Sequence, residues 1–258
     1  MRLTGQVALV TGAGGVGGIG FAAARALAAD GALVVISSTT DRIHDRVAEI
    51  GELGGTAVGV VADLMVPGAA DRLVASALEP AGRVDICVNN AGMIAVGGDV
   101  VDAALHTTTD AQWHDGIERN LTTCFEVTRA AVTAMRSRGY GRVVNVASTS
   151  GPVQAFVGDV VYHAAKAGMV GFTRAVALEC AGAGITVNAV APGWIATGSQ
   201  TMFEHEAGAL TPLRRSGTAD EVAAAIRFLA DPTASYITGQ LLVVDGGNSL
   251  PENRAWTP

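Results

Sequence analysis

Short, nearly continuous runs of apolar residues alternate along the chain with longer windows in which apolar residues recur at helical spacing. The short runs are rich in β-branched residues and predict strands at residues 7–11, 33–37, 57–61, 86–89, 142–147, 186–190 and 241–244. The windows between them predict helices at residues 19–29, 43–53, 69–78, 112–138, 161–180 and 220–229. Apolar strands separated by helices are typical of a parallel sheet covered on both faces.

The expected fold is therefore α/β: a doubly wound, Rossmann-type parallel sheet of about seven strands between two layers of helices. No linker, repeat or low-complexity tract interrupts the series, so we expect residues 1–258 to form a single domain. Segments 93–109 and 193–219 fit neither pattern. Each follows a predicted strand, and the ligand crevice of such a sheet lies at the carboxyl ends of its strands. We expect 193–219 to be a mobile lid over the substrate, with an ordinary surface loop as the alternative.

Composition and charge exclude several classes of protein. The formal net charge is −7 and the basic residues do not cluster, which argues against nucleic-acid binding. No apolar stretch is long enough for a membrane helix, and the first residues lead into a strand without a signal-peptide pattern, so a cytoplasmic location is expected. Cys87, Cys124 and Cys180 are too widely spaced for a metal site and are expected to be reduced core residues.

The first predicted strand runs into a glycine-rich turn and then into a helix. Gly12, Gly14 and Gly17 form a G-x-G-x-x-G in the strand–loop–helix context that a dinucleotide fingerprint requires. Gly18 and Ile19 then open the helix, whose N-terminus favours a pyrophosphate. No Gly-Lys-Ser/Thr follows, so the turn is not a P-loop. The turn predicts a dinucleotide site, and a plain tight turn is the alternative.

Tyr162 and Lys166 are four residues apart in a predicted helix and therefore share one helix face. A phenol with a pKa near 10 is a poor base at neutral pH. A nearby ammonium group and a positively charged nicotinamide are expected to lower that pKa by about 3 units, which requires roughly 4 kcal/mol. The pair predicts acid–base chemistry, although a Tyr-x-x-x-Lys on a solvated helix face is also common.

Taken in order, the motifs resemble those of the short-chain dehydrogenase/reductase family, and within it the 3-oxoacyl-carrier-protein reductases most closely. The resemblance extends over nearly the whole chain and rests on the glycine-rich turn, Asp63, Asn89-Asn90-Ala91-Gly92, Asn120, Ser148, Tyr162-x-x-x-Lys166, Pro192-Gly193, Tyr236-Ile237-Thr238-Gly239-Gln240 and Asp245-Gly246-Gly247.

The resemblance implies a role for each of four catalytic residues. Tyr162 would be the general acid in reduction or the base in oxidation. Ser148 would hydrogen-bond the substrate oxygen, and Lys166 would lower the tyrosine pKa and hold the nicotinamide ribose. Asn120 would position a water that relays protons to Lys166. Without the resemblance, Ser148 could equally cap the end of a strand and Asn120 could be a helix-surface residue.

The resemblance also implies a set of cofactor contacts and no metal. Thr197 would hydrogen-bond the nicotinamide carboxamide. The whole set is Gly12, Gly14, Gly17, Gly18, Ile19, Ser38, Thr39, Asp63, Leu64, Asn90, Ala91, Gly92, Tyr162, Lys166, Pro192, Gly193, Ile195 and Thr197.

Two spacings depart from the family pattern. Five residues separate Gly12 from Gly18 where three are usual, which leaves open which glycines contact phosphate. The interval from Ser148 to Tyr162 is one residue longer than is common.

The residues at the end of the second predicted strand indicate whether the cofactor is NADP(H) or NAD(H). Ser38 takes the place where an NAD-binding carboxylate is expected, and Arg42 nearby suits a 2′-phosphate, whereas Asp41 argues for NAD. We expect NADP(H) in preference to NAD(H).

The expected activity is hydride transfer between a nicotinamide and a carbonyl or secondary alcohol, of the 3-oxoacyl ketoreductase type. A sugar, polyol or steroid alcohol dehydrogenase is the alternative enzyme, and a non-catalytic dinucleotide sensor is the alternative of another class. The resemblance implies a homotetramer. Use of an acyl-carrier protein is open: residues 181–184 offer no basic docking group, and Arg136, Arg138 and Arg142 are the candidate patch.

Overall fold

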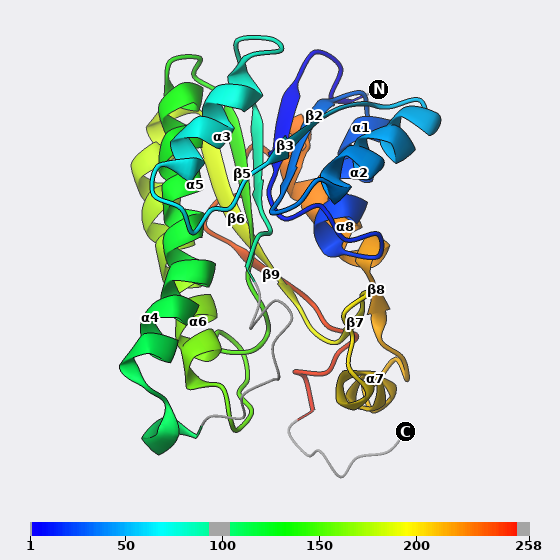
Figure 1. The fold of residues 1–258 in the computed structure, drawn as a ribbon, viewed down its shortest axis with the longest axis vertical. Helices are drawn as coiled ribbons and strands as arrows, with labels where there is room; N and C mark the ends of the chain where they lie inside the picture. The colour runs from blue at the N-terminus through cyan, green and yellow to red at the C-terminus, as the bar shows by residue number, and fades with distance from the viewer. Residues whose placement is uncertain (1, 93–103, 252–258) are drawn as a thin grey trace.

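A computed structural model describes residues 2–92 and 104–251, which contain a seven-stranded sheet. The order is β3-β2-β1-β4-β5-β6-β9, and every neighbouring pair is parallel. This is the predicted doubly wound arrangement (Figure 1). The strands are β1 (Val7–Val10), β2 (Leu33–Ser38), β3 (Thr56–Val61), β4 (Ile86–Asn89), β5 (Gly141–Val146), β6 (Ile185–Pro192) and β9 (Leu241–Val244).

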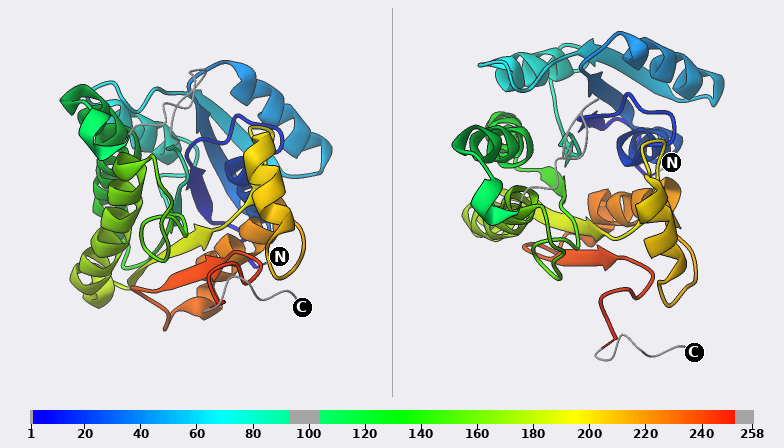
Figure 2. Two further views of the ribbon diagram at one scale, coloured as in Figure 1. Left: turned by 90° about the horizontal axis from the view of Figure 1, so that it is seen from below. Right: turned by 60° about the horizontal axis from the view of Figure 1, so that its bottom comes forward.

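Helices cover both faces of the sheet, as predicted. One layer holds α1, α2 and α8, and the other holds α3 to α6 (Figures 1 and 2). Their bounds are α1 (Ile19–Ala29), α2 (Arg42–Glu52), α3 (Ala69–Leu78), α4 (Asp110–Ile117), α5 (Thr123–Arg136), α6 (Val160–Cys180) and α8 (Ala219–Ala230).

The sheet separates two apolar cores, because successive side chains along a buried strand point to opposite faces. In β1, Ala8 and Val10 pack on the side of α1 and α8, while Val7 and Leu9 pack on the side of α3 and α5. A third, smaller cluster under α5 and α6 includes Cys124. A central strand such as β5, buried along its whole length, is therefore a fixed platform for residues at its carboxyl end.

The predicted helix 112–138 is in fact three consecutive segments. Helix α4 begins at Asp110, where Thr109 and Gln112 form a capping box. A π-helical turn (Glu118–Thr122) then joins α4 to α5. Periodicity alone did not separate these segments, because one extra residue per turn leaves the apolar spacing almost unchanged.

Segment 193–219 is structured, contrary to its unassigned status in the sequence. It contains β7 (Ile195–Ala196), α7 (Met202–Ala209) and β8 (Gly217–Thr218), and the two strands pair with each other. A capping box of Thr201 and Glu204 starts α7. Within segment 93–109, residues 93–103 lie outside the described part, and Leu105–Thr107 forms a 3₁₀ turn.

The negative expectations about cysteines and membranes can be compared with the described residues. Cys87, Cys124 and Cys180 are free and buried, as predicted. Within residues 2–92 and 104–251, no helix combines the length and apolar character needed to cross a bilayer. No group of His, Cys, Asp and Glu side chains there has the geometry of a metal site.

Candidate active site

Ser148 and Tyr162 meet just beyond the carboxyl end of β5. Ser148 follows this strand, and its Oγ accepts a hydrogen bond from the Ser150 amide (3.1 Å). The Tyr162 side chain is hydrogen-bonded to Ser148. Asp159 caps α6 and accepts from the Tyr162 amide (3.0 Å), which fixes the first turn of the helix that carries the phenol.

Lys166 lies one turn further along α6 and is the only lysine in the chain. Its side chain is buried, with 3% of the residue exposed, and Nζ donates to the Val146 carbonyl at the end of β5 (3.0 Å). Nζ lies 5.5 Å from the centroid of the Tyr162 ring, so the predicted shared face is present. Burial lowers the pKa of Lys166 to about 8, because the charged form loses hydration.

The direction of the Tyr162 pKa differs from the sequence-based expectation. Burial raises this pKa, the hydrogen bond with Ser148 lowers it, and the carboxylates of Asp159 and Glu204 raise it. The protein groups by themselves therefore keep the phenol protonated at neutral pH. A protonated phenol hydrogen-bonded to Ser148 is arranged to donate a proton, which is the requirement of a general acid in carbonyl reduction.

Asn120 is located in the π-helical turn between α4 and α5. Such turns often occur at functional sites, because they redirect a side chain that a regular helix would place elsewhere. Asn120 is buried, and its Nδ2 donates to the Gly116 carbonyl (3.1 Å). A Cβ on Gly92 would lie 2.8 Å from its Oδ1, so the turn brings Asn120 against the end of the Asn89-Asn90-Ala91-Gly92 motif.

A buried polar network that the sequence did not suggest lies between the sheet and α5 and α6. Asn89 Nδ2 donates to Asn145 Oδ1 and to Thr128 Oγ1, both at 2.8 Å. Asn145 in turn donates to Thr173 on α6 (2.8 Å), and the Cys124 thiol donates to Asn145 Oδ1 (3.5 Å). The network joins β4, β5, α5 and α6, so it fixes the helix that carries Tyr162 and Lys166 relative to the strands.

The glycine-rich turn packs directly against the loop after β4. Gly12 has φ +67°, and a Cβ there would lie 2.8 Å from Ala91 Cα. Thr11 Oγ1 accepts from the amides of Asn90 and Ala91 (both 3.0 Å), and Asn90 Nδ2 donates to the Gly12 carbonyl (3.0 Å). A side chain on Gly20 would collide with Asn90. Both turns are therefore held in place around the N-terminus of α1.

The start of α1 is suited to an anion. Its N-cap, Gly18, has no side chain to cap the helix, and the first turn carries no acidic residue. Amides of this turn and the positive end of the helix dipole favour a phosphate. A Cβ on Gly14 would lie 2.6 Å from both Ser38 Cβ and Arg42 Nε, so the turn also runs close to the end of β2. These features fit a dinucleotide.

The remaining predicted cofactor residues occupy the same edge of the sheet with different exposure. Ser38 is the last residue of β2 and donates to the Thr40 carbonyl (2.7 Å), while Thr39 is exposed. Asp63 is also exposed, and its carboxylate accepts from the Met65 amide (3.0 Å). Leu64 is buried in the core on the α3 side.

Segment 193–219 reaches back to the glycine-rich turn. It leaves the sheet after Pro192, where the Gly193 amide donates to the Val244 carbonyl (3.0 Å). Ile195 is in β7, and Thr197 Oγ1 lies 3.1 Å from Ser199 Oγ. A Cβ on Gly17 would lie 3.3 Å from the Gly198 amide nitrogen. The segment therefore contacts the predicted nucleotide site at one end and supplies Glu204 near Tyr162 at the other.

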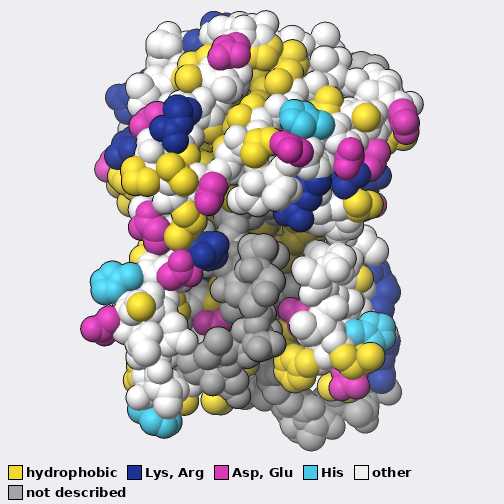
Figure 3. Space-filling model, in the orientation of Figure 1, with side chains coloured by type: hydrophobic (Ala, Val, Ile, Leu, Met, Phe, Trp, Pro, Cys, Tyr) yellow, Lys and Arg dark blue, Asp and Glu magenta, His cyan; other side chains and the backbone are white. Residues whose placement is uncertain are grey.

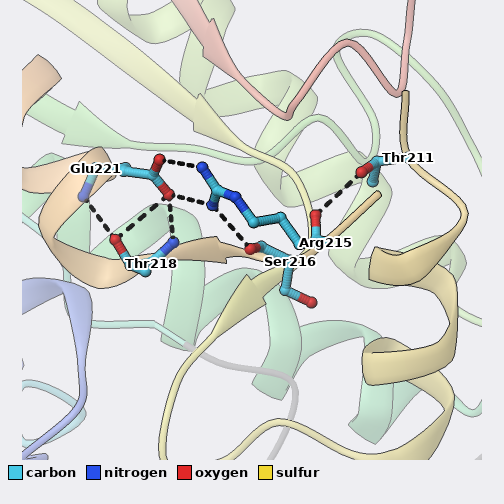
Figure 4. Close-up of polar contacts among 5 residues, drawn as sticks. All are labelled: Thr211, Arg215, Ser216, Thr218 and Glu221. Atoms are coloured by element: carbon cyan, nitrogen blue, oxygen red, sulfur yellow. Dashed lines mark hydrogen bonds and ion pairs between the residues drawn. The ribbon is translucent and has the colours of Figure 1, made fainter. Parts of the chain in front are cut away.

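The far end of this segment is anchored by an ion pair (Figure 4). Arg215 binds both carboxylate oxygens of Glu221, at 2.8 and 2.6 Å, and holds the pKa of that carboxylate at about 2. Glu221 also accepts from the Thr218 amide in the capping box that starts α8 (2.8 Å). Thr211 Oγ1 donates to the Arg215 carbonyl (3.0 Å).

The walls of a cavity of about 440 Å³ include none of the predicted site residues. These walls come from the loop after β3 and from α4 and the π-helical turn. They are Met65, Trp113, His114, Asp115, Ile117, Glu118 and Thr122.

Arg142 does not belong to the basic patch considered for carrier-protein docking. Arg142 is buried, and its guanidinium donates to the carbonyls of Gly141 and Pro232 at the amino end of β5, opposite the site. Arg136 ends α5 at that same edge. On the face shown in Figure 3, Lys and Arg side chains are scattered among acidic ones rather than gathered in one patch.

Sequence reasoning missed three groups that belong to the site. Asp159 and Glu204 influence the Tyr162 pKa, and Asn145 anchors the polar network. Asp159 had a readable signal, an acidic residue at the start of a helix, and Glu204 had the Thr201-x-x-Glu204 capping box. No sequence signal pointed to Asn145, because a polar residue within an apolar strand pattern does not reveal which side chains it will bind.

Comparisons with known proteins agree with this geometry. A sequence profile described as "Enoyl-(Acyl carrier protein) reductase" matches residues 12–249. The chain is 43% identical over 252 residues to a 3-oxoacyl-[acyl-carrier-protein] reductase of Synechocystis, covering 95% of this chain and 97% of that protein. It is 38% identical over 251 residues to the enzyme of that name in Escherichia coli, with 96% and 98% covered. A solved short-chain dehydrogenase/reductase variant from Serratia marcescens superposes with a TM-score of 0.87 at 30% identity, covering 96% of this chain and 100% of that one.

The single lysine allows its protonation to be measured directly. With ¹³C-labelled lysine, the nucleotide-free protein should give one lysine signal, titrating near pH 8. Because the folded pKa lies below the ordinary value, the unfolded chain binds the extra proton between about pH 8 and 10.5, so Lys166 makes the protein more stable as pH rises through this window. A signal that titrates at the ordinary value of 10.5 would show that the ammonium is hydrated rather than buried.

Proposed function

The chain belongs to the short-chain dehydrogenase/reductase family, and on this premise we propose that it is an NAD(P)-dependent ketoreductase acting on a 3-oxoacyl group. The observation that carries the proposal is the placement of Tyr162 beside Ser148 and the buried Lys166, next to a turn suited to a dinucleotide.

In the proposed reaction, a bound nicotinamide dinucleotide supplies the hydride. Ser148 donates a hydrogen bond to the substrate carbonyl oxygen; its own Oγ accepts from the Ser150 amide, which leaves its hydroxyl proton directed elsewhere. Tyr162 donates its phenolic proton to that oxygen as negative charge develops. Lys166 stabilises the phenolate that remains and holds the ribose, and Asn120 positions the water that returns a proton.

The surroundings of the site favour an apolar acyl compound over a sugar or polyol. Side chains of the loop between Ser148 and Tyr162 and of α7 expose apolar surface, which would lose hydration energy if left uncovered. They are Val153, Phe156, Val157, Met202, Phe203 and Leu210. A non-catalytic dinucleotide sensor is disfavoured, since both Tyr162 and Lys166 are present and close to each other.

Tyr162→Phe should abolish carbonyl reduction while dinucleotide binding stays nearly unchanged, because only the proton donor is removed. General acid–base steps contribute about 10²–10⁴-fold, so a residual kcat above roughly a tenth of wild type would refute the assignment. The assay follows nicotinamide absorbance over a panel of 3-oxoacyl thioesters, sugar ketones and enoyl thioesters. Tyr236→Phe, at a fully exposed tyrosine, is the control and should behave as wild type.

NADP(H) is the proposed cofactor, in preference to NAD(H). Ser38 and Arg42 both lie against Gly14 at the end of β2, where a ribose 2′-phosphate would sit, and a guanidinium pairs well with a phosphate.

Arg42→Ala should raise the KM for NADPH about tenfold and leave the KM for NADH within about twofold, because only NADPH carries the phosphate that this charge would bind. Steady-state kinetics with each cofactor measure this. Arg72→Ala, on α3 in the other helix layer, is a control for loss of a surface charge. An equal change in both constants would argue for NAD(H).

We further propose that segment 193–219 is a lid. It joins the glycine-rich turn, through the Gly17–Gly198 contact, to Glu204 near Tyr162. Thr197 would hydrogen-bond the nicotinamide carboxamide and couple cofactor binding to closure. Most of α7 is exposed, so the helix has little buried surface to hold it against the core.

Amide hydrogen exchange of residues 194–212 should slow when NADP(H) is added, because a lid loses mobility when its ligand arrives. The peptide covering α2 provides a comparison that should change less. If residues 194–212 are equally protected with and without NADP(H), segment 193–219 is not a lid.

A homotetramer in the cytoplasm is the proposed assembly and location. Phe125 and Phe172 meet edge to face on α5 and α6 (6.2 Å), and Phe125 is partly exposed, as is Leu178 on the same layer. Such an apolar helix face is suited to pairing with a second copy. The reduced cysteines suit a reducing compartment.

Sedimentation at micromolar concentration should give a mass four times the 26.1 kDa of one chain, and a monomer would contradict the proposed tetramer.

A further inference from the structure

His163, the residue after Tyr162, is bound on both ring nitrogens by backbone groups. The Phe156 amide contacts Nε2 (3.1 Å), and Nδ1 lies 2.5 Å from the Asp159 carbonyl oxygen. A backbone amide can only donate, so Nε2 must accept and Nδ1 must carry the proton that it donates to Asp159. The imidazole is therefore neutral in this arrangement, in a single tautomer.

The contacts attach the loop between Ser148 and Tyr162 to the first turn of α6. Besides the hydrogen bond, the Phe156 ring packs edge to face on the imidazole, with centroids 4.5 Å apart. The start of the loop contacts the same residue: Gly151 has φ +99°, and a Cβ there would collide with the His163 carbonyl oxygen. The loop thus touches His163 at its backbone and at its side chain.

The hydrogen bonds within the loop lie mainly before Phe156. Its first half is held by Thr149, whose carbonyl accepts from the amides of Val153 and Gln154 (both 3.0 Å). After Gln154, the Phe156 amide and ring both contact His163. Phe156 is nonetheless 41% exposed, next to the still more exposed Val157. An aromatic ring fixed at one edge and open on its face can bind an apolar group without first being ordered.

We propose that His163 is a positioning residue that fixes Phe156 as the recognition surface for the apolar body of the substrate. This rests on the proposed ketoreductase function and extends it. The chemical class that the surface selects is an acyl compound with an aliphatic or aromatic chain beside the keto group. His163 acts on binding through Phe156, whereas the proton transfer stays with Tyr162.

Steady-state reduction of a short and a long 3-oxoacyl thioester tests the role of His163 in positioning Phe156. His163→Ala should raise the KM for the long substrate about tenfold, since a hydrogen bond and a ring contact are lost, and leave kcat within about twofold. His163→Gln keeps an acceptor for the Phe156 amide and should recover most of the affinity. His114→Ala is the matched control: His114 makes the same contact to a carbonyl four residues earlier (2.6 Å to Asp110) but is not bonded to a loop amide.

A double-mutant cycle with Phe156→Ala separates this role from general destabilisation. If His163 acts through Phe156, the double variant should raise KM no more than the larger of the two single variants. If the two effects multiply, or if His163→Ala lowers kcat and leaves KM unchanged, the proposal is wrong.

Amide hydrogen exchange tests the contact between His163 and the loop that carries Phe156, even if the protein reduces no substrate. A peptide covering residues 151–159 should exchange faster in His163→Ala than in wild type and return toward wild type in His163→Gln. Unchanged exchange in His163→Ala would overturn the attachment of the loop. A wild-type protein that reduces no carbonyl on the panel but shows the exchange pattern would instead overturn the proposed function and leave the attachment standing.

Discussion

The hydrogen bond from the buried Lys166 ammonium to the Val146 carbonyl is the contact on which the rest of the site depends. Removing an ammonium group from water is costly, and the lowered pKa of Lys166 is the measure of that cost. The acceptor lies at the end of β5, which is hydrogen-bonded to β4 on one side and β6 on the other, so it cannot move to accommodate a misplaced helix. Tyr162, one turn earlier on α6, is therefore held beside Ser148.

Close backbone contacts connect this catalytic part to the predicted nucleotide site. Gly12 lies against Ala91, and Gly92 lies against Asn120, so the turn after β1, the loop after β4 and the π-helical turn form one continuous surface. Gly17 adds the segment after β6 to it. In each case a Cβ would come close to a neighbouring residue, and Gly12 and Gly92 also have positive φ (+67° and +139°), so both space and backbone conformation favour glycine.

The sequence predicted the sheet and the shared helix face of Tyr162 and Lys166 correctly, because both depend on local patterns. Apolar strands and the i, i+4 spacing of Tyr162 and Lys166 need no knowledge of distant contacts. The features it missed depend on tertiary contacts: the π-helical turn around Asn120, the two-residue strands β7 and β8, and the Asn89–Asn145 network. The raised pKa of Tyr162 in the nucleotide-free protein was also missed, since periodicity shows a neighbouring cation but not the extent of burial.

In the proposed reaction, hydride goes to a carbonyl carbon while Tyr162 protonates the oxygen. The most direct test supplies nicotinamide dinucleotide deuterated at the transferable position of C4 together with a 3-oxoacyl thioester and an enoyl thioester, and locates the deuterium in the products by NMR. We expect a 3-hydroxyacyl product with deuterium on the carbinol carbon. Deuterium delivered to the carbon–carbon double bond of an enoyl thioester, with the 3-oxoacyl compound left unreacted, would contradict it.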